Sequence, residues 1–245
     1  MNPLAPLIAA SIVGLVVLVS FDPVSVGVAL IFEALLLPWL RLPARRSRQI
    51  VAIVLISAAL GGVATALYGR PSGETFFVWG PVNITAGSLE LALLVGLRIV
   101  AIALPGALVF AATNITALAD ALTQIARLPA RFVAGALSSL RMMSLLADDW
   151  RVMGYARRAR GLAARGPFQF VGQSFALFVR AVRRGSALAT TMEARGFGSQ
   201  SPRSWSRPSV WRARDGLIVA SGFVVAGLIV SISVATGSWE LVVFG

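Results

Sequence analysis

The chain contains no cysteine, no histidine and no lysine, and each absence excludes a class of chemistry. Without cysteine, no disulfide, thiolate nucleophile or thiolate metal site can form. Without histidine, the commonest metal ligand and the commonest general base are missing. Without lysine, the chain can form neither a Walker A loop nor a Schiff base. We therefore expect a protein that is not an enzyme by itself, is not a standard ATPase, and holds no metal or cofactor.

Charged residues are also scarce, at 13% of the 245 residues, whereas hydrophobic residues make up 57%. A soluble domain normally carries about a quarter charged residues. The net charge is nevertheless +12, because all 22 basic residues are arginine. Such a balance can indicate nucleic-acid binding. Here the arginines lie between apolar segments, which favours the positive-inside bias of membrane proteins, so we expect contact with membrane lipids and no nucleic-acid partner.

Long apolar segments predict membrane-spanning helices. Segments 51–69 and 216–236 contain 19 and 21 residues without a charge, long enough to cross about 30 Å of hydrocarbon. Segment 87–113 is a further span, and Pro105 inside it is a site where the helix is expected to kink.

The N-terminal region has two apolar stretches, 4–21 and 24–40, separated by Asp22-Pro23. An Asp-Pro pair ends one helix and can begin another. We interpret the region as two short spans joined by a tight turn; the alternative is one span plus a re-entrant or interfacial segment. A cleaved signal peptide is not expected, because the start is not basic and no clear small-residue cleavage site follows.

Together these segments predict an all-α, multi-pass membrane protein with about five transmembrane helices. We expect transmembrane helices 1–4 in residues 1–113, a cytoplasmic helical region in 114–213, and the last span with the C-terminus in 214–245. The basic loop 41–48 and segment 114–215, which holds 16 of the 22 arginines, are expected in the cytoplasm. The N-terminus is then cytoplasmic and the C-terminus external.

The arginine-rich region is predicted to be helical over 116–128, 131–160 and 168–195. The last of these helices is amphipathic, with an apolar stripe of Val171, Phe175, Phe178, Val182 and Ala189. Its opposite face is polar and contains Gln169, Gln173, Arg180, Arg183, Arg184 and Arg195. Such a helix can pack its apolar stripe on a neighbour with the arginines solvated, and it can lie in the inner membrane interface with arginines facing lipid phosphates. The two arrangements are compatible, and together we favour them over a nucleic-acid role.

Two short motifs end the two long helices, Ala159-Arg160-Gly161 and Ala194-Arg195-Gly196, thirty-five residues apart. Glycine suits the left-handed position that ends many helices, and arginine suits the last turn. A single copy is an ordinary helix end. Two copies on consecutive helices indicate arginines that bind carboxylate-lined grooves, where a guanidinium can contact two oxygens.

With these motifs the chain resembles the transmembrane coupling subunit, or T component, of the energy-coupling-factor (ECF) importers of vitamins and metals. The resemblance rests on the Asp22-Pro23 turn, Leu122, Pro129, Arg141, both Ala-Arg-Gly motifs, and the run from Glu193 to Gly198 with the basic stretch after it. The resemblance extends to the last span.

The resemblance implies a multi-pass protein of a prokaryotic cell membrane. It implies that Arg160 and Arg195 dock into grooves on two ABC-type ATP-binding subunits, with Ala159, Gly161, Ala194 and Gly196 completing the motifs. It also implies that the long helices hold a small membrane protein, the substrate-binding S component. Arg165, in Ala164-Arg165-Gly166, is an alternative to Arg160.

Two ionisable residues lie inside segment 87–113, Glu90 near one end and Arg98 further in. Ionisable groups in a span are candidates for function. We expect instead that Arg98 pairs with Glu33 or Glu90 as a structural contact. The alternative function is a self-contained secondary transporter or channel, which would show internal repeats and several polar residues at mid-membrane; neither is evident.

Overall fold

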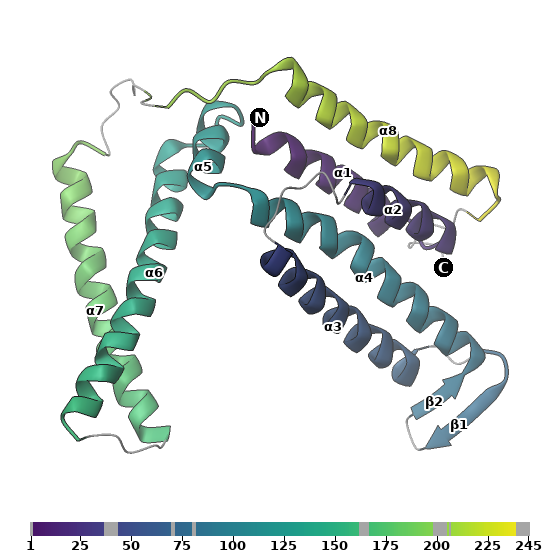
Figure 1. Ribbon diagram of the computed structural model, residues 1–245, viewed down its shortest axis with the longest axis horizontal. Coiled ribbons are helices and arrows are strands. Elements are labelled where there is room, and N and C mark those ends of the chain that lie inside the picture. Colours follow the sequence, from purple (N-terminus) through teal and green to yellow (C-terminus); the bar gives the residue numbers. More distant parts are fainter. Residues whose placement is uncertain are drawn as a thin grey trace. The chain divides into compact units, whose positions relative to one another are not determined.

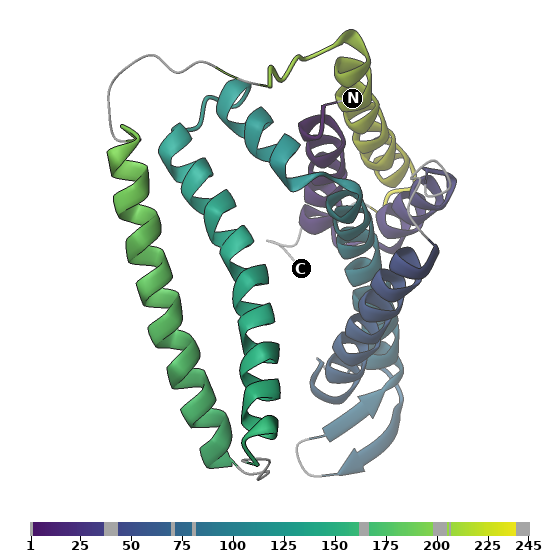
Figure 2. The same cartoon turned by 60° about the vertical axis from the view of Figure 1, so that its left-hand side comes forward.

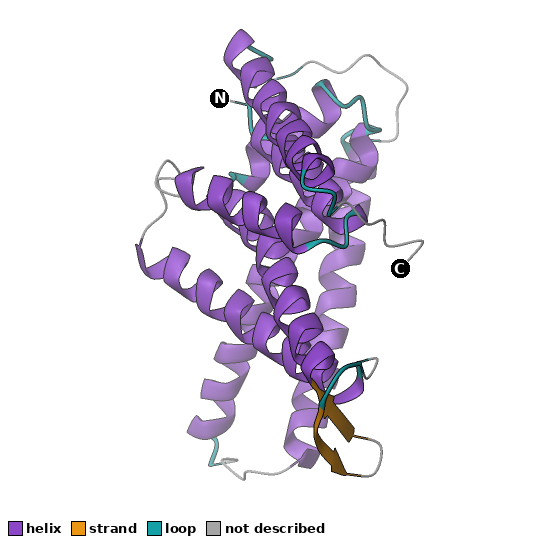
Figure 3. Ribbon diagram, turned by 90° about the vertical axis from the view of Figure 1, so that its right-hand side faces the viewer, coloured by secondary structure: helices purple, strands orange, loops and turns teal. Residues whose placement is uncertain are grey.

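The computed structural model describes residues 2–36, 44–69, 72–79, 82–161, 167–197, 205 and 207–238. Helices dominate this described part, with one β-hairpin (Figure 3). In chain order the elements are α1 (Leu4–Val19), α2 (Pro23–Leu36), α3 (Ala44–Tyr68), β1 (Thr75–Trp79), β2 (Val82–Thr85), α4 (Ala86–Ala112), α5 (Ile115–Gln124), α6 (Ala130–Ala159), α7 (Pro167–Ala194) and α8 (Ala213–Ala235). The predicted all-α membrane fold is confirmed.

The chain divides into two compact units. The first, here called the apolar unit, comprises Met1–Leu118 and Val210–Gly245. The second, here called the arginine-rich unit, comprises Ala119–Ser209. The boundaries fall inside α5 and a few residues before α8. That the arginine-rich unit lies in the cytoplasm stays a prediction.

Three helices of the apolar unit are long and apolar enough to cross a membrane, over Arg45–Tyr68, Ala86–Ala112 and Ala213–Ala235. The apolar helices α1 and α2 are shorter. Helix α3 begins at Ala44, earlier than the predicted residue 51. The arginines before residue 51 were predicted to lie in a loop, but arginine is a good helix former and its long side chain carries the charge away from the apolar layer.

Helices α1 and α8 run parallel. At one end the Asn2 amide donates to Asp215 Oδ1 at 2.8 Å, and at the other the Ser233 hydroxyl donates to Asp22 Oδ2 at 2.6 Å. Asp215 and Ser233 are 18 residues apart on α8, about 27 Å along a helix and close to the roughly 30 Å of hydrocarbon in a membrane. Helix α1 with its following turn therefore covers the same distance as a full span, which favours two N-terminal spans.

Helices α3 and α4 also pack closely, and small residues make this possible. A Cβ placed at Gly62 would lie 3.1 Å from the Ala92 carbonyl oxygen, and one at Gly96 would lie 3.4 Å from that of Ala58. These pairs make the two helices antiparallel. Without a hydrophobic driving force between helices in lipid, such close backbone approach is a main source of association.

The described helix termini of the apolar unit gather at two ends. The starts of α1, α3 and α8 and the end of α4 form one end, which carries Arg45, Arg46, Arg48, Arg212 and Arg214 and is here called the basic end. The opposite end carries the turn between α1 and α2 and the β-hairpin (Figure 1). Large apolar side chains point outward between the ends, among them Ile53, Leu60, Leu93, Leu217 and Phe223.

The β-hairpin was not predicted. Strands β1 and β2 pair antiparallel, with Thr75 opposite Thr85 and Trp79 opposite Val82. Each strand is too short to show a pattern that distinguishes it from a loop. Thr85 then caps α4 in a reciprocal pair, because Ser88 N donates to Thr85 Oγ1 at 3.2 Å and Thr85 N donates to Ser88 Oγ at 2.9 Å.

In the arginine-rich unit, α6 and α7 form an antiparallel hairpin of long helices (Figure 2). Their bounds lie within one residue of the predicted 131–160 and 168–195. Helix α5 ends at Gln124, before the predicted residue 128, since Arg127 takes a left-handed φ of 54° and Pro129 follows. The side chain of Gln124 binds the segment that precedes α8. Its Nε2 donates to the Arg207 carbonyl at 2.8 Å, and its Oε1 accepts from Ser209 N at 2.7 Å.

Candidate functional site

The motif Ala159-Arg160-Gly161 forms the end of α6. Ala159 is the last helical residue and Arg160 is the C-cap, with φ −87° and ψ 9°. Gly161 takes a left-handed φ of 72° and donates to the Arg158 carbonyl at 3.0 Å. A residue with a Cβ is strained in this conformation, so glycine is required locally. The Arg160 side chain is exposed.

The motif Ala194-Arg195-Gly196 ends α7 with the same geometry. Gly196 takes a φ of 71° and donates to the Glu193 carbonyl at 2.9 Å, while Phe197 N donates to the Met192 carbonyl at 3.0 Å. These two bonds make a Schellman motif. Arg195 is exposed. Both motifs thus place an exposed arginine at the helix cap and a left-handed glycine after it.

The two motif arginines lie at opposite ends of the α6–α7 hairpin, because the helices are antiparallel and each motif stands at a helix C-terminus. Helix α7 has 28 residues, which corresponds to about 42 Å. One carboxylate-lined groove cannot bind both arginines across this distance. The alternative arginine, Arg165, lies outside the described residues.

The faces of α7 are oriented differently from the expectation of a packed apolar stripe. The side chains of Val171, Phe175 and Phe178 are 64%, 68% and 64% exposed. The polar residues Gln173 and Arg184 instead turn toward α6. The prediction that the apolar stripe packs on the neighbouring helix is therefore wrong within this chain.

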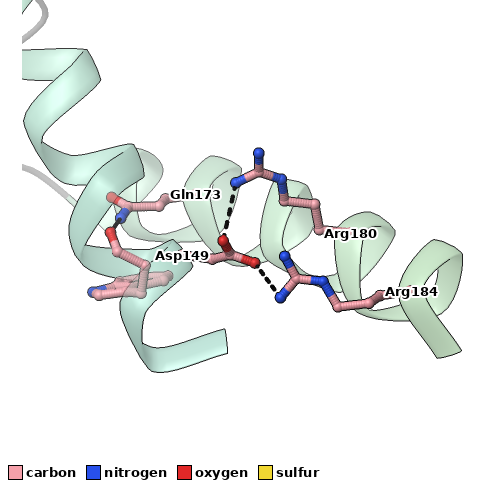
Figure 4. A network of polar contacts seen from close by, with 5 residues as sticks. Asp149, Gln173, Arg180 and Arg184 are labelled. Atoms are coloured by element: carbon pink, nitrogen blue, oxygen red, sulfur yellow. Dashed lines mark hydrogen bonds and ion pairs between the residues drawn. The ribbon is translucent and has the colours of Figure 1, made fainter. Parts of the chain in front are cut away.

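Asp149 of α6 contacts the arginine face of α7 in this orientation (Figure 4). Its side chain on α6 is 16% exposed, and its carboxylate pairs with Arg184 at 2.9 Å and with Arg180 at 3.5 Å. Gln173 Nε2 also donates to the Trp150 carbonyl at 2.9 Å. The expectation that the α7 arginines are simply solvated is thus wrong for Arg180 and Arg184. The acidic pair Asp148-Asp149 inside an arginine-rich segment is the sequence signal for this contact.

Beyond Asp149 the two helices diverge and leave an open hollow of about 360 Å³. Methionines and small residues line it, including Met142, Met143, Met192, Ser138, Gly185 and Ala189. Methionine is flexible and polarisable, so such a surface adapts to the shape of a partner. Together with the exposed aromatic stripe of α7, the hollow makes the α6–α7 hairpin unusually apolar for a region with so many arginines.

Arg98 does not form the expected pair with Glu33 or Glu90. Its guanidinium donates to the Leu18 carbonyl and lies 5.2 Å from the centre of the Phe21 ring. Glu90 is exposed, and Glu33 is buried with both carboxylate oxygens unbonded. Arg98 therefore joins α4 to the end of α1. The described residues contain no cluster of carboxylates suited to a metal ion.

The chain is similar to a family of transport proteins. The family model CbiQ, described as cobalt transport protein, matches residues 2–205. The match begins twenty residues before the Asp22-Pro23 turn, where the resemblance noted in the sequence begins. It ends before α8, whereas that resemblance extends through α8.

Curated relatives from several bacteria carry the name energy-coupling factor transporter transmembrane protein EcfT. The protein from Exiguobacterium sibiricum is 30% identical over 216 residues, covering 81% of this chain and 82% of that protein. The one from Limosilactobacillus fermentum is 29% identical over 179 residues, covering 68% and 67%. The one from Bacillus subtilis is 29% identical over 170 residues, covering 64% of each.

Proposed function

Since this chain belongs to the CbiQ family, described as cobalt transport protein, we propose that it is the transmembrane T component of an energy-coupling factor importer. It is then a membrane coupling subunit that hydrolyses no ATP itself, and two ABC-type ATP-binding subunits supply the energy. The names of the relatives point to this role. The residues that perform it are inferred from the geometry of the arginine-rich unit.

The observation that carries the proposal is the placement of Arg160 and Arg195. Both are exposed residues at a helix end, each followed by a left-handed glycine, and they lie at opposite ends of one antiparallel helix pair. A pair of ATP-binding subunits offers two equivalent grooves, and each arginine contacts one of them. A guanidinium is suited to this contact because its planar fork binds a carboxylate through two parallel hydrogen bonds.

The apolar surface of α6 and α7 binds the second partner, the S component, which carries the substrate. Phe175 and Phe178 are exposed, and the methionine-lined hollow lies nearby along the hairpin. Exposed apolar surface of this kind marks a protein or membrane interface. Movement of the ATP-binding subunits then reaches the S component through α6 and α7. The cargo, a vitamin or a metal ion, is chosen by the S component.

The basic end of the apolar unit faces the cytoplasm. Arginines are concentrated there, and the described residues of the hairpin end include no arginine. The positive-inside bias then supports an orientation with Asn2 and the start of α8 inside, and the β-hairpin and the end of α8 outside.

The test is co-purification of the two ATP-binding subunits with the double variant Arg160→Ala/Arg195→Ala. Truncating one partner of a buried charge pair costs about 2–5 kcal/mol, a loss of roughly thirtyfold or more in affinity per site. Lysine variants should rescue poorly, because lysine keeps the charge without the planar fork.

Arg183→Ala is the matched control, since Arg183 is exposed on α7 away from both helix ends. Equal recovery of the ATP-binding subunits with the double variant and with this control would reduce the two arginines to ordinary helix caps. Stoichiometric binding of a vitamin or metal ion by the isolated chain would support a self-contained transporter instead.

A further inference from the structure

A groove of about 320 Å³ lies between the last turns of α6 and the first turns of α7. Three arginines line it, Arg157 and Arg160 from α6 and Arg180 from α7, together with Gln173. No acidic residue is among the lining side chains. The groove is therefore lined by positive charge, with Asp149 in contact with Arg180, and it shares Arg160 with the first Ala-Arg-Gly motif.

The arginines of this groove are incompletely paired in the described part of the chain. Arg157 Nε is buried and has no hydrogen-bond partner. Arg180 has only the longer contact to Asp149, at 3.5 Å, and its side chain is 52% exposed. Arg184 holds the shorter contact with Asp149, at 2.9 Å. A buried donor without a partner is unfavourable. Arg180 keeps exposed donors that an anionic group entering the groove can bind.

We propose that this groove binds a carboxylate side chain of the ATP-binding subunit that docks on Arg160. The inference rests on the proposed function, and it adds Arg157 and Arg180 as binding residues beyond the motif. The contact is then reciprocal, because Arg160 extends toward the partner while the groove beside it receives a side chain from the partner. Charge complementarity carries the assignment, since three arginines and no acidic residue line one open groove.

Two neighbouring arginines provide matched controls. Arg158 lies on the same turn of α6 but points back along its own helix, donating to the Gly154 carbonyl at 3.3 Å and lying 4.9 Å from the Tyr155 ring. Arg184 shares Asp149 with Arg180 but does not line the groove. Arg158→Ala therefore removes the same charge from the same helix end, and Arg184→Ala disturbs the same ion-pair network.

The experiment measures the affinity of the purified full-length chain, in detergent, for the two ATP-binding subunits of the same organism. Arg157→Ala and Arg180→Ala should each weaken binding by about tenfold or more. Arg158→Ala and Arg184→Ala should stay within about threefold of the unmodified chain. The affinity should also fall with added salt more steeply for the unmodified chain than for Arg157→Ala.

The outcomes separate this inference from the proposed function. If Arg160→Ala/Arg195→Ala loses the ATP-binding subunits while Arg157→Ala and Arg180→Ala behave like their controls, the groove is not a binding site and the proposed function stands. If the double variant also binds normally, the proposed function fails. Binding to phosphatidylglycerol vesicles is measured in parallel. Loss of vesicle binding alone in Arg157→Ala and Arg180→Ala would make the groove a lipid site and overturn the inference.

Discussion

The Ser233 hydroxyl donates a hydrogen bond of 2.6 Å to Asp22 Oδ2, joining residues that are 211 positions apart. The same carboxylate caps α2 by accepting from Ser25 N at 2.7 Å, and it also accepts from the Ser20 hydroxyl. Asp22, Ser20, Ser25 and Ser233 are all fully or almost fully buried. One carboxylate therefore holds together the end of α1, the start of α2 and the last third of α8.

Asp22→Ala should destabilise the chain strongly, because it removes a helix cap and takes away the acceptor of two buried donors, the Ser25 amide and the Ser233 hydroxyl. We expect a loss of about 2–4 kcal/mol in the free energy of unfolding, and about 1–2 kcal/mol for Ser233→Ala. Thermal unfolding of the purified chain in detergent measures both. Asp148→Ala is the control, since Asp148 is 69% exposed and has only a 3.7 Å contact with Arg151. Equal melting temperatures for the Asp22 and Asp148 variants would contradict this role of Asp22.

Gly222→Ala should separate α1 from α8. A Cβ at this position would lie 2.9 Å from both Cα and Cβ of Ala9, closer than real side chains approach, and the Cα belongs to the backbone and cannot rotate away. Overpacking of this kind costs about 1–3 kcal/mol. Gly227→Ala on the same helix is the control, because its Cβ meets nothing within 4 Å. A thermal shift in detergent distinguishes them, and an unchanged Gly222→Ala variant would show that the two helices are not in close contact.

Asp149→Ala should allow α6 and α7 to separate, because Asp149 is the α6 residue that pairs with two arginines of α7. It leaves Arg180 and Arg184 beside each other without the shared carboxylate, so attraction is replaced by repulsion. Because Arg184 is still 40% exposed, we expect a modest loss of about 1–2 kcal/mol. The absence of cysteine makes the chain suitable for spin labels on introduced cysteines, one at Ser139 and one at Thr190. The distance distribution should broaden in the variant, and an unchanged distribution would mean that Asp149 does not hold the helices together.

The orientation of the apolar unit predicts opposite labelling at the two ends of α8. A cysteine introduced at Ser238, which follows α8, should react with a membrane-impermeant maleimide in intact cells. A cysteine introduced at Ser206, before α8, should react only after the membrane is permeabilised. The reverse pattern would place the basic end outside and contradict the topology.

The sequence by itself determined the features that depend on neighbouring residues. Apolar runs of about twenty residues predicted α4 and α8, because a helix crossing lipid must satisfy its backbone internally and present apolar side chains throughout. The ends of α6 and α7 were also predictable. A left-handed glycine and its hydrogen bonds to residues three to five positions earlier are local, so Gly161 and Gly196 marked both ends correctly.

Only the tertiary structure decided which side chains meet across the chain. The sequence pattern of α7 shows an apolar and a polar face, but it does not indicate which of them contacts α6. In the structure the face with Arg180 and Arg184 contacts α6, because both arginines pair with Asp149. Arg98 donates a hydrogen bond to the carbonyl of Leu18, 80 residues away, and not to a carboxylate. The contact of Asp22 with Ser233 likewise depends on α1 and α8 being parallel and close. Such contacts depend on the packing of whole helices, and no local pattern in the sequence records which helices become neighbours.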